Sequence, residues 1–339
     1  MSALDERSLR DAAPAAEPAL PIRVVAAGGG TGLPRVLAGL AAGIEPEADR
    51  PVEVTAVVTT ADDGGSSGAL RRAYGVPAAG DVRNCLVALA AGTNPLAAVF
   101  QHRFAGTDGL AGHTVGNLVL AALAERLGGF AEAVEAAAAL LGVRGRVLPA
   151  TEEPVELVAR LEDGRVVRGE TRISRAGGRV SEVRLARPAA APREAIEAVL
   201  AADVVVLGPG SLFSSVLASV AGRGMREALR ATAATRVLVV NLVTQPGETD
   251  GFSAADHVRA ARDHLGDAID VALCHRGPLP PAIVAAHAAE RAHPVGVDRA
   301  EVEALGAAPF LADLLAAGTV ARHDPQKLAR ALLAIARAR

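Results

Sequence analysis

The sequence predicts an α/β protein with a Rossmann-like, doubly wound and mainly parallel sheet that carries a small antiparallel β insertion. Short apolar runs typical of buried strands alternate with helical patterns along most of the chain. Polar, glycine-rich clusters follow five of these runs. Ligands bind beyond the carboxyl ends of the strands in such sheets, so the clusters predict one nucleotide-sized pocket.

The hydrophobic pattern places the individual elements. Strands are expected over 22–27, 52–58, 203–207, 236–240 and 269–274, with a weaker signal at 294–297. Helices are expected over 33–42, 81–91, 113–127, 131–141, 192–201, 253–265, 281–292 and 324–336. The region of about 144–187 alternates apolar and polar residues between glycine turns, which predicts the antiparallel insertion. Residues 1–20 predict a disordered tail before a single domain over 21–339.

The composition restricts the class of protein. Aromatic residues make up 2% of the chain and the net charge is −3, which argues against a nucleic-acid partner. A cytoplasmic protein is expected, because the sequence shows no signal-peptide pattern and no apolar run long enough for membrane insertion. Cys85 and Cys274 fit no metal or disulfide framework, so we interpret them as small buried side chains.

The chain contains a single lysine, Lys327, far from every glycine cluster. A Walker A loop and a pyridoxal phosphate site both need a lysine, so neither is expected. Phosphate charge must therefore be met by main-chain amides, a metal ion or arginine. The arginines nearest the clusters are Arg35, Arg71, Arg72 and Arg83.

Two of the clusters have the context of anion-binding loops. Gly28–Gly32 lies between a strand and a helix, which favours a phosphate or ribose cradle; a plain tight turn is the alternative. Leu33 stands where the fingerprint GxGxxG has its third glycine, so this is not the standard NAD form. Gly208-Pro209-Gly210-Ser211 predicts a second anion loop. Its serine comes after the second glycine, which excludes a GxSxG nucleophile elbow.

A third cluster pairs two carboxylates with two hydroxyls. Asp62 and Asp63 end the second strand, and Ser66 and Ser67 follow them. The aspartates are suited to hold a divalent ion, to anchor ribose hydroxyls or to cap the next helix. These three alternatives stay open on the sequence alone.

The remaining candidates are polar residues at helix starts. Asp81 is expected to cap its helix, with Arg83 and Asn84 in the first turn facing the ligand. His113 and Asn117 are spaced to share one face near a helix start, although a buried, satisfied histidine is the alternative. No Ser-His-Asp set, metal-binding histidine cluster or general-base pair is recognisable, so no catalytic residue is predicted.

The fifth cluster, Asn241–Gly247, lies where a strand gives way to a helix and suits contacts to a base, sugar or carbonyl. The complete set of candidate ligand-binding residues is Gly28, Gly29, Gly30, Thr31, Gly32, Thr59, Asp62, Asp63, Ser66, Ser67, Asp81, Arg83, Asn84, His113, Asn117, Gly208, Gly210, Ser211, Asn241, Thr244 and Gln245. Asp62 and Asp63 are also the candidate metal ligands, for Mg²⁺.

Taken in chain order, these clusters resemble those of the bacterial gluconeogenesis factor (YvcK-like) family, within the superfamily of the 2-phospho-L-lactate transferase CofD. The matching motifs are GGGTGL at 28–33, TTADDGGSSG at 59–68, GDVRNCLVAL at 80–89, GHTVGNL at 112–118, VRGRVLPAT at 143–151, GPGSL at 208–212 and TQPGETDGF at 244–252. The resemblance runs from about residue 22 to residue 274. The N-terminal tail and the last sixty or so residues carry little of it.

The resemblance implies a cytoplasmic protein that self-associates as a homo-oligomer and acts in carbon metabolism and cell shape. Its members look like binders of UDP-sugars such as UDP-N-acetylglucosamine, without an established reaction. The transferases of the superfamily use a divalent metal held by an aspartate that Asp62 or Asp63 resembles. They also carry a Gly-Asp-Arg-Asp element that this sequence lacks, with Gly112–Asn117 in its place.

Our leading hypothesis is therefore a UDP-sugar-sensing regulator of cell shape and wall synthesis on gluconeogenic carbon sources. In it the two anion loops cradle the diphosphate, Asp62 and Asp63 hold ribose or metal, and Arg83 offsets phosphate charge. Asn117, Asn241 and Gln245 read the uridine or the sugar. The alternatives are a metal-dependent transferase and a scaffold for cell-wall or morphogenesis proteins. The preferred base, a role for NAD and the need for Mg²⁺ stay open.

Overall fold

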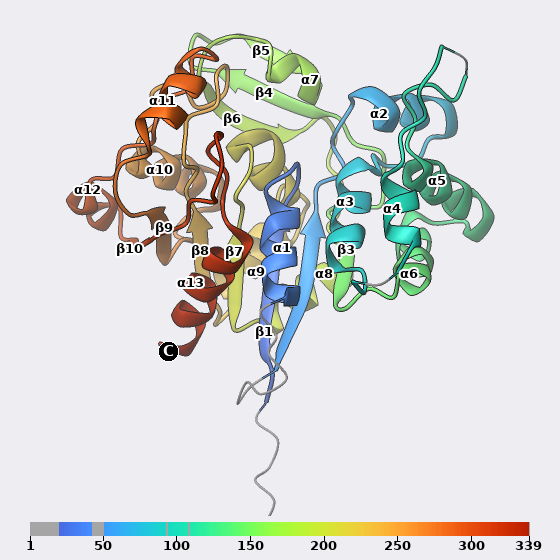
Figure 1. Cartoon of the computed structure of the whole chain (residues 1–339), viewed down its shortest axis with the longest axis horizontal. Coiled ribbons are helices and arrows are strands. Elements are labelled where there is room, and N and C mark those ends of the chain that lie inside the picture. Colours follow the sequence, from blue (N-terminus) through green and yellow to red (C-terminus); the bar gives the residue numbers. More distant parts are fainter. Residues whose placement is uncertain (1–19, 43–50, 93, 108, 339) are drawn as a thin grey trace, which may run out of the picture.

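The computed structural model describes residues 20–42, 51–92, 94–107 and 109–338. Its main sheet has seven strands in the order β10-β9-β8-β7-β1-β2-β3, and every neighbouring pair is parallel (Figure 1). The strands are β1 (Ile22–Gly28), β2 (Val52–Val58), β3 (Arg146–Pro149), β7 (Val204–Leu207), β8 (Thr235–Val239), β9 (Val271–His275) and β10 (Ala308–Ala312). The predicted α/β class and parallel sheet are confirmed.

The strand order reverses direction between β1 and β7. From β1 the chain proceeds through β2 to β3 at one edge, and from β7 it proceeds through β8 and β9 to β10 at the other edge. Read from β3, this is the Rossmann order 3-2-1-4-5-6 with one strand added. The crevice of a doubly wound sheet lies beyond the carboxyl ends of the two strands at this reversal.

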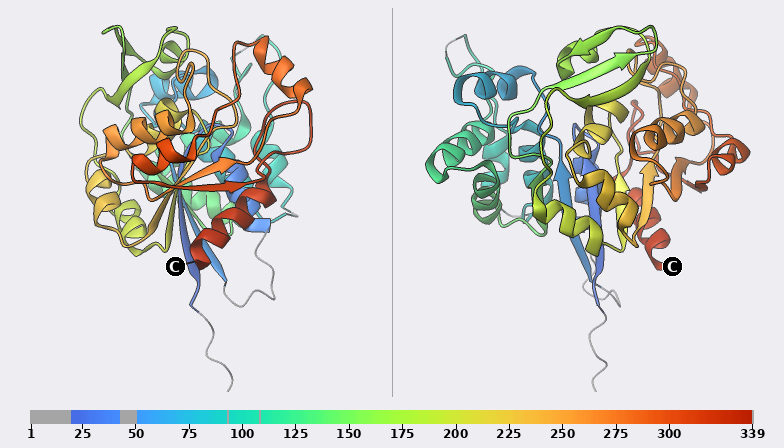
Figure 2. Two further views of the ribbon diagram at one scale, coloured as in Figure 1. Left: turned by 90° about the vertical axis from the view of Figure 1, so that its left-hand side faces the viewer. Right: turned by 180° about the vertical axis from the view of Figure 1, so that it is seen from behind.

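Helices cover both faces of the sheet (Figure 2). They are α1 (Leu33–Ala42), α2 (Gly65–Tyr74), α3 (Gly80–Leu89), α4 (Leu96–Gln101), α5 (Val115–Leu127), α6 (Phe130–Leu141), α7 (Glu170–Ile173), α8 (Arg193–Ala201), the π-helix η1 (Leu212–Leu217), α9 (Met225–Ala231), α10 (Ala254–Leu265), α11 (Pro281–Ala288), α12 (Arg299–Ala304) and α13 (Pro325–Arg337). Local chemistry sets some of their starts: Ser253 forms a capping box with Asp256 at α10, and Asp324 caps α13. Among the described residues, every helix is too short or too polar to cross a membrane.

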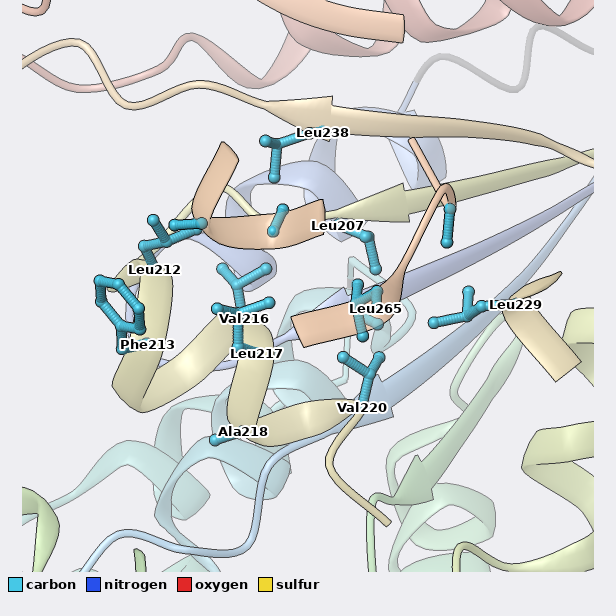
Figure 3. Packing of buried hydrophobic residues seen from close by; sticks show 14 of the residues in the cluster. Leu207, Leu212, Phe213, Val216, Leu217, Ala218, Val220, Leu229, Leu238 and Leu265 are labelled. Carbon is cyan, nitrogen blue, oxygen red and sulfur yellow. The ribbon is translucent and has the colours of Figure 1, made fainter. Parts of the chain in front are cut away.

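The core forms two layers because successive residues of a strand point to opposite faces. Val24 and Ala26 of β1 pack on the side of α1 and α13, whereas Val25 and Ala27 pack on the side of α8, η1 and α10. Figure 3 shows the second layer around η1, where Val216 lies toward Leu207 of β7 and Phe213 lies beside Leu212 at the start of η1. Both cysteines, Cys85 and Cys274, are buried and free, as predicted.

The insertion is a separate antiparallel sheet of β4 (Leu157–Leu161), β5 (Val166–Arg168) and β6 (Val180–Leu185), in the order β5-β4-β6. With α7 it lies above the carboxyl ends of the main strands (Figures 1 and 2). The predicted boundary at about 144 was too early, because β3 pairs in parallel with β2 and belongs to the main sheet. A four-residue edge strand is too short to show a period that distinguishes the two sheets.

The C-terminal third departs from the sequence prediction in two places. The weak strand signal at 294–297 corresponds to a single bridge between Pro294 and Val243. The strand that completes the sheet is instead β10, which the sequence analysis missed because its APFLA sequence is short and interrupted by proline. The predicted tail at 1–20 lies outside the described residues, apart from Leu20.

Candidate functional site

The two predicted anion loops meet at the reversal between β1 and β7. Gly32 lies so close to the second loop that a Cβ on it would be 2.1 Å from the carbonyl oxygen of Pro209. A Cβ on Gly210 would be 3.4 Å from the carbonyl oxygen of Gly29. Gly208, which has a φ of +83°, turns the chain directly after β7, and the bond from Gly208 to Pro209 is cis. Glycine at these positions therefore lets the two backbones touch.

Asp81 connects the first loop to the start of α3. Its carboxylate Oδ2 accepts a hydrogen bond from the backbone N–H of Gly30 at 2.7 Å. The prediction that Asp81 caps its own helix was wrong: the residue before α3 is Ala79, which has no side-chain cap, and Asp81 lies in the first turn. Burial raises the pKa of Asp81 to about 6; the Gly30 hydrogen bond opposes this shift and the charge of Asp62 adds to it.

Arg83 is buried, with 6% of its surface exposed, and its guanidinium bridges α3 to the start of α5. Nη1 donates to Thr114 Oγ1 at 2.5 Å and to Asn117 Oδ1 at 2.7 Å, and Nη2 donates to Asn84 Oδ1 at 2.8 Å. These acceptors are neutral, and no salt bridge within 4.0 Å joins Arg83 to a carboxylate of the described residues. Burial lowers the pKa of Arg83, and the Arg103 charge adds to this effect.

The hydroxyl of Ser66 contacts two other predicted residues. Ser66 Oγ lies 3.0 Å from His113 Nδ1 and accepts from Asn117 Nδ2 at 3.1 Å. We expected His113 and Asn117 to share a helix face, but His113 precedes α5. The loop before the helix nevertheless brings His113 to the same hydroxyl as Asn117. The neighbouring Ser67 Oγ accepts from the Gly80 N–H at 3.1 Å and fixes the start of α3.

The aspartates at the end of β2 face a third carboxylate that the sequence did not reveal. Ligand oxygens of Asp62, Asp63 and Glu170 lie within 4.8 Å of one another. Asp62 Oδ1 accepts from the Gly64 N–H at 2.8 Å, and Asp63 Oδ1 accepts from the N–H and Oγ1 of Thr171 at 2.9 and 2.6 Å. Burial, followed by the charges of Asp62 and Asp63, raises the pKa of Glu170 to about 7. Three carboxylates at this spacing suit a hard divalent cation.

The fifth cluster supports the second anion loop. Asn241 Nδ2 donates to the Gly210 carbonyl at 2.8 Å, and Gln245 Nε2 donates to Ser211 Oγ at 2.9 Å. Thr244 points elsewhere: its Oγ1 accepts from the His293 N–H at 3.0 Å, so it holds the neighbouring loop and not the crevice. Thr59 packs beside the first loop, where a Cβ on Gly29 would be 2.5 Å from its methyl group.

A cavity of about 170 Å³ lies between these loops. Its lining includes Thr31, Gly32, Gly210, Asn241 and Gln245 from the predicted set. Its walls also include Arg35, Arg322 and His323, which bring positive charge and an imidazole to the place where the anion loops meet. Arg35 was among the arginines noted in the sequence, whereas Arg322 and His323 were missed because they follow a single glycine, Gly318, and no polar glycine-rich cluster.

The predicted residues thus form two adjoining groups at one crevice. One group surrounds the cavity between the anion loops, and the other contains the carboxylates with the Ser66–Asn117–Arg83 network. The hydrogen bond from Gly30 to Asp81 joins them. The arrangement offers main-chain amides and arginines for an anion, beside carboxylates for a cation or for hydroxyl groups.

The comparisons with known proteins agree with this architecture. The model of the family "2-phospho-L-lactate transferase CofD" matches residues 24–315, which span both anion loops and the carboxylates. The chain belongs to the CofD family. Arg322 and His323 lie beyond the matched part of this CofD-family chain.

Relatives within the CofD family carry a common name. The gluconeogenesis factor of Halalkalibacterium halodurans is 43% identical over 314 residues, covering 91% of this chain and 95% of that protein. The gluconeogenesis factor of Bacillus subtilis is 40% identical over 309 residues, covering 90% and 95%. A crystal structure of a UPF0052-family protein from Bacillus halodurans is similar with a TM-score of 0.88 at 42% identity, covering 93% of this chain and all of that one.

Proposed function

We propose that this chain binds a nucleoside diphosphate sugar of the UDP-N-acetylglucosamine kind and acts as a cytoplasmic regulator. The observation that carries the proposal is the contact between the two glycine loops at the reversal of the sheet, where Gly32 meets Pro209. Two such loops side by side present backbone amides and a helix start to one anion. A diphosphate has the length to engage both loops.

The charge around the cavity supports a phosphate-containing ligand. Arg35 and Arg322 line it, and arginine binds phosphate through a planar fork of donors. Lys327 is engaged elsewhere, because its Nζ donates to Asp313 Oδ2 at 2.6 Å and to the Leu315 carbonyl at 2.8 Å. Arginine and main-chain amides would therefore replace the lysine of other phosphate sites.

The size of the cavity indicates which part of the ligand it holds. Sites for whole drug-sized ligands usually measure about 300–1,000 Å³, whereas this cavity measures about 170 Å³. We assign it the diphosphate and an adjoining group. The rest of the ligand would extend along the crevice toward Asp62, Asp63 and Glu170, which would bind sugar hydroxyls directly or through Mg²⁺.

The names of the relatives support a biological role. Curated relatives are named gluconeogenesis factor, which supports a role in carbon metabolism. We propose that UDP-sugar occupancy controls contacts with cell-wall or morphogenesis proteins, and that the chain self-associates. Pull-downs with and without UDP-N-acetylglucosamine test the first point, and light scattering tests the second.

Isothermal titration calorimetry tests the ligand directly. We expect saturable binding of UDP-N-acetylglucosamine, a lower affinity for UDP and no binding of free N-acetylglucosamine, because in this proposal the anion loops recognise the diphosphate. Titrations with Mg²⁺ and with EDTA show whether the carboxylates act through a metal. Folded protein that gives no heat at millimolar UDP-sugar rejects the proposal.

A second function, metal-dependent group transfer, is favoured by one observation: the three carboxylates at the end of β2 and in α7. Incubation with guanylated phospholactate, a deazaflavin acceptor and Mg²⁺ tests it. Product formation that disappears in Asp62→Asn would establish the transferase activity.

A further inference from the structure

The loop before α5 holds His113 against the start of α2. The His113 N–H donates to the Leu110 carbonyl at 3.0 Å, and the His113 carbonyl accepts from the Phe104 N–H at 2.9 Å. Helix α5 lies beside α2 and α3 (Figure 1), and Ser66 of α2 contacts the ring, with its Oγ 3.0 Å from Nδ1. Three hydrogen bonds therefore fix the position of the imidazole.

A chain of hydrogen bonds connects this ring to Arg83. Arg83 Nη1 donates to Asn117 Oδ1 at 2.7 Å. Asn117 Nδ2 in turn lies 3.1 Å from Ser66 Oγ, the atom that contacts His113. Arg83, Asn117 and Ser66 are only 6%, 1% and 7% exposed, so water competes little for these bonds.

The guanidinium of Arg83 sets the direction of every bond in the chain. Because a guanidinium only donates, the Asn117 atom that meets it is the carbonyl oxygen, and Nδ2 is left to donate to Ser66. The Ser66 hydroxyl has one hydrogen of its own, and His113 Nδ1 is the one acceptor that the described residues offer it. Nδ1 therefore accepts, and the neutral imidazole carries its proton on Nε2.

Nε2 is the hydrogen-bonding atom of His113 that has no partner in the described part of the chain. It is also accessible. His113 is half-buried, and its Nε2 does not belong to the enclosed atoms without a partner, which include Nε2 of His257 and of His323. The chain from Arg83 thus presents one N–H donor within the group of side chains that contains the carboxylates.

We propose that His113 donates a hydrogen bond from Nε2 to an acceptor oxygen at the sugar end of the bound nucleotide sugar. Ser66, Asn117 and Arg83 are positioning residues, which fix the tautomer that makes this donor available. The inference rests on the proposed function and assigns a specificity-determining residue to the same crevice. It also changes the role expected of Arg83, whose effect on the ligand passes through His113.

The carboxylates explain why a donor is needed at this place. Ionised Asp62 and Asp63 only accept hydrogen bonds, so they bind sugar hydroxyls through the hydroxyl hydrogens. An oxygen without a hydrogen, such as the acetamido carbonyl, needs a donor instead. His113 supplies that donor beside the two acceptors, and the sugar is recognised by both kinds of group.

The direction of the chain can be reversed by one nearly isosteric substitution. Asn117→Asp keeps an oxygen for Arg83 and replaces the Nδ2 donor with a second acceptor. The Ser66 hydrogen then turns to the new carboxylate, and Ser66 Oγ accepts from His113 Nδ1. We expect the proton of the imidazole to move from Nε2 to Nδ1, and the affinity for UDP-N-acetylglucosamine to fall about tenfold, as for one hydrogen bond.

Long-range ¹H–¹⁵N NMR spectra of histidine-labelled protein measure the tautomer at about pH 8, above the usual pKa of histidine. His113 is assigned from its variant. We expect the proton on Nε2 in wild type and on Nδ1 in Asn117→Asp; the same tautomer in both proteins overturns the inference. If Asn117→Asp does not fold, Ser66→Ala replaces it: loss of the hydroxyl should shift the Nδ1 resonance, and an unchanged resonance overturns the inference.

Binding to UDP-N-acetylglucosamine and to UDP locates the acceptor. His113→Asn keeps an acceptor for Ser66 near the position of Nδ1 and removes Nε2. By calorimetry we expect His113→Asn to bind UDP-N-acetylglucosamine about tenfold more weakly than wild type does, and UDP equally well. An unchanged affinity for UDP-N-acetylglucosamine overturns the inference, and so does an equal loss for both ligands. Thermal unfolding checks that the variant folds.

His102→Asn is the matched control. His102 belongs to the same loop, but it is exposed and its ring contacts Phe104 edge to face at 5.3 Å. His102→Asn should bind both ligands like wild type. Absence of UDP-N-acetylglucosamine binding by wild type removes the proposed function together with this inference, whereas a loss confined to the tests of His113 removes the inference alone.

Discussion

The carboxylate of Asp81 accepts a hydrogen bond from the backbone N–H of Gly30 at 2.7 Å, although 51 positions separate the two residues in the sequence. This bond ties the first anion loop to α3, and through α3 to the Arg83 network. The loop is therefore positioned by the side of the crevice that carries the carboxylates. We expect a structural change in the first anion loop to affect the carboxylates and the Arg83 network through this bond, and the reverse.

The first prediction concerns pH and Asp81. Its pKa of about 6 in the folded protein lies above the usual 3.8, so the folded state favours the protonated form and stability falls as pH rises from about 4 to about 6. Asp81→Asn keeps an acceptor for Gly30 without the charge. We expect it to be more stable than wild type at pH 7 by about 2 kcal/mol, and equal at pH 4.

Urea unfolding of both proteins at pH 4, 5, 6 and 7 measures this difference. Glu248 also has a raised pKa, and its contribution is common to both proteins and cancels in the comparison. The charge of Asp81 is the smallest of the causes that raise the pKa of Glu170, so a minor part of the difference passes through Glu170. A constant difference across the series would contradict the assignment to Asp81.

The second prediction concerns the attachment of the insertion to the main sheet. Asp63 accepts two hydrogen bonds from Thr171 of α7. Thr171→Val keeps the shape of the side chain and removes the hydroxyl donor. We expect amide hydrogen exchange over 169–173 to become about tenfold faster, because a hydrogen bond to a charged group contributes about 1.5–3 kcal/mol.

Ser181→Ala is the control for the Thr171–Asp63 contact. Ser181 Oγ donates to the Arg160 carbonyl within the same small sheet, away from Asp63. It should leave exchange over 169–173 unchanged. Equal protection in wild type and Thr171→Val would show that the Thr171 hydroxyl does not hold the insertion.

The third prediction concerns Arg83. We expect Arg83→Ala to weaken UDP-sugar binding by about tenfold or more, because a buried cation and the anchor of Asn117 are lost together. Arg83→Lys should recover part of the affinity, since lysine restores the charge without the planar fork. Arg72→Ala, on the exposed side of α2, should bind like wild type. Calorimetry measures all three, and full affinity in Arg83→Ala would remove this residue from the site.

The fourth prediction separates the contact between the loops from general packing. A Cβ at Gly32 would lie 2.1 Å from Pro209 O, and a Cβ at Gly39 would lie 2.0 Å from Pro325 O in the α1–α13 packing. Both substitutions to alanine should cost about 1–3 kcal/mol of stability. Only Gly32→Ala should abolish binding. Gly92→Ala, with no atom within 4 Å, should change neither property, and retained binding in Gly32→Ala would argue against the anion loops.

Much of the fold was predictable because its signals are local. The apolar runs of β1, β2, β7 and β8 mark buried parallel strands, and the boundaries of β2 were predicted to the residue. Because parallel strands end at the same edge of a sheet, these runs also predicted that Asp62, the anion loops and Asn241 lie along one edge. Strand β10 was not predicted, because five residues that include a proline carry too weak a hydrophobic pattern.

The residues missed at the site share one property. Glu170 is in a four-residue helix of the insertion, and its approach to Asp62 joins segments more than a hundred residues apart. Glu248 stood in a recognised motif, but its burial and its bond from the Ser214 N–H at 2.9 Å depend on packing. His323 lies in a hairpin whose single glycine, Gly318, does not indicate a cavity. No sequence signature shows which groups these three residues meet, because each acquires its partners from elsewhere in the chain.

The sequence by itself determined the elements, their parallel arrangement and the edge at which polar loops gather, since these follow from period and turn chemistry over a few residues. Only the tertiary structure decided which groups meet: Asp81 with Gly30, Asp63 with Thr171, and His323 with the cavity. Hydrogen bonds and charge interactions act over a few ångströms in space, and distance along the chain does not set that separation.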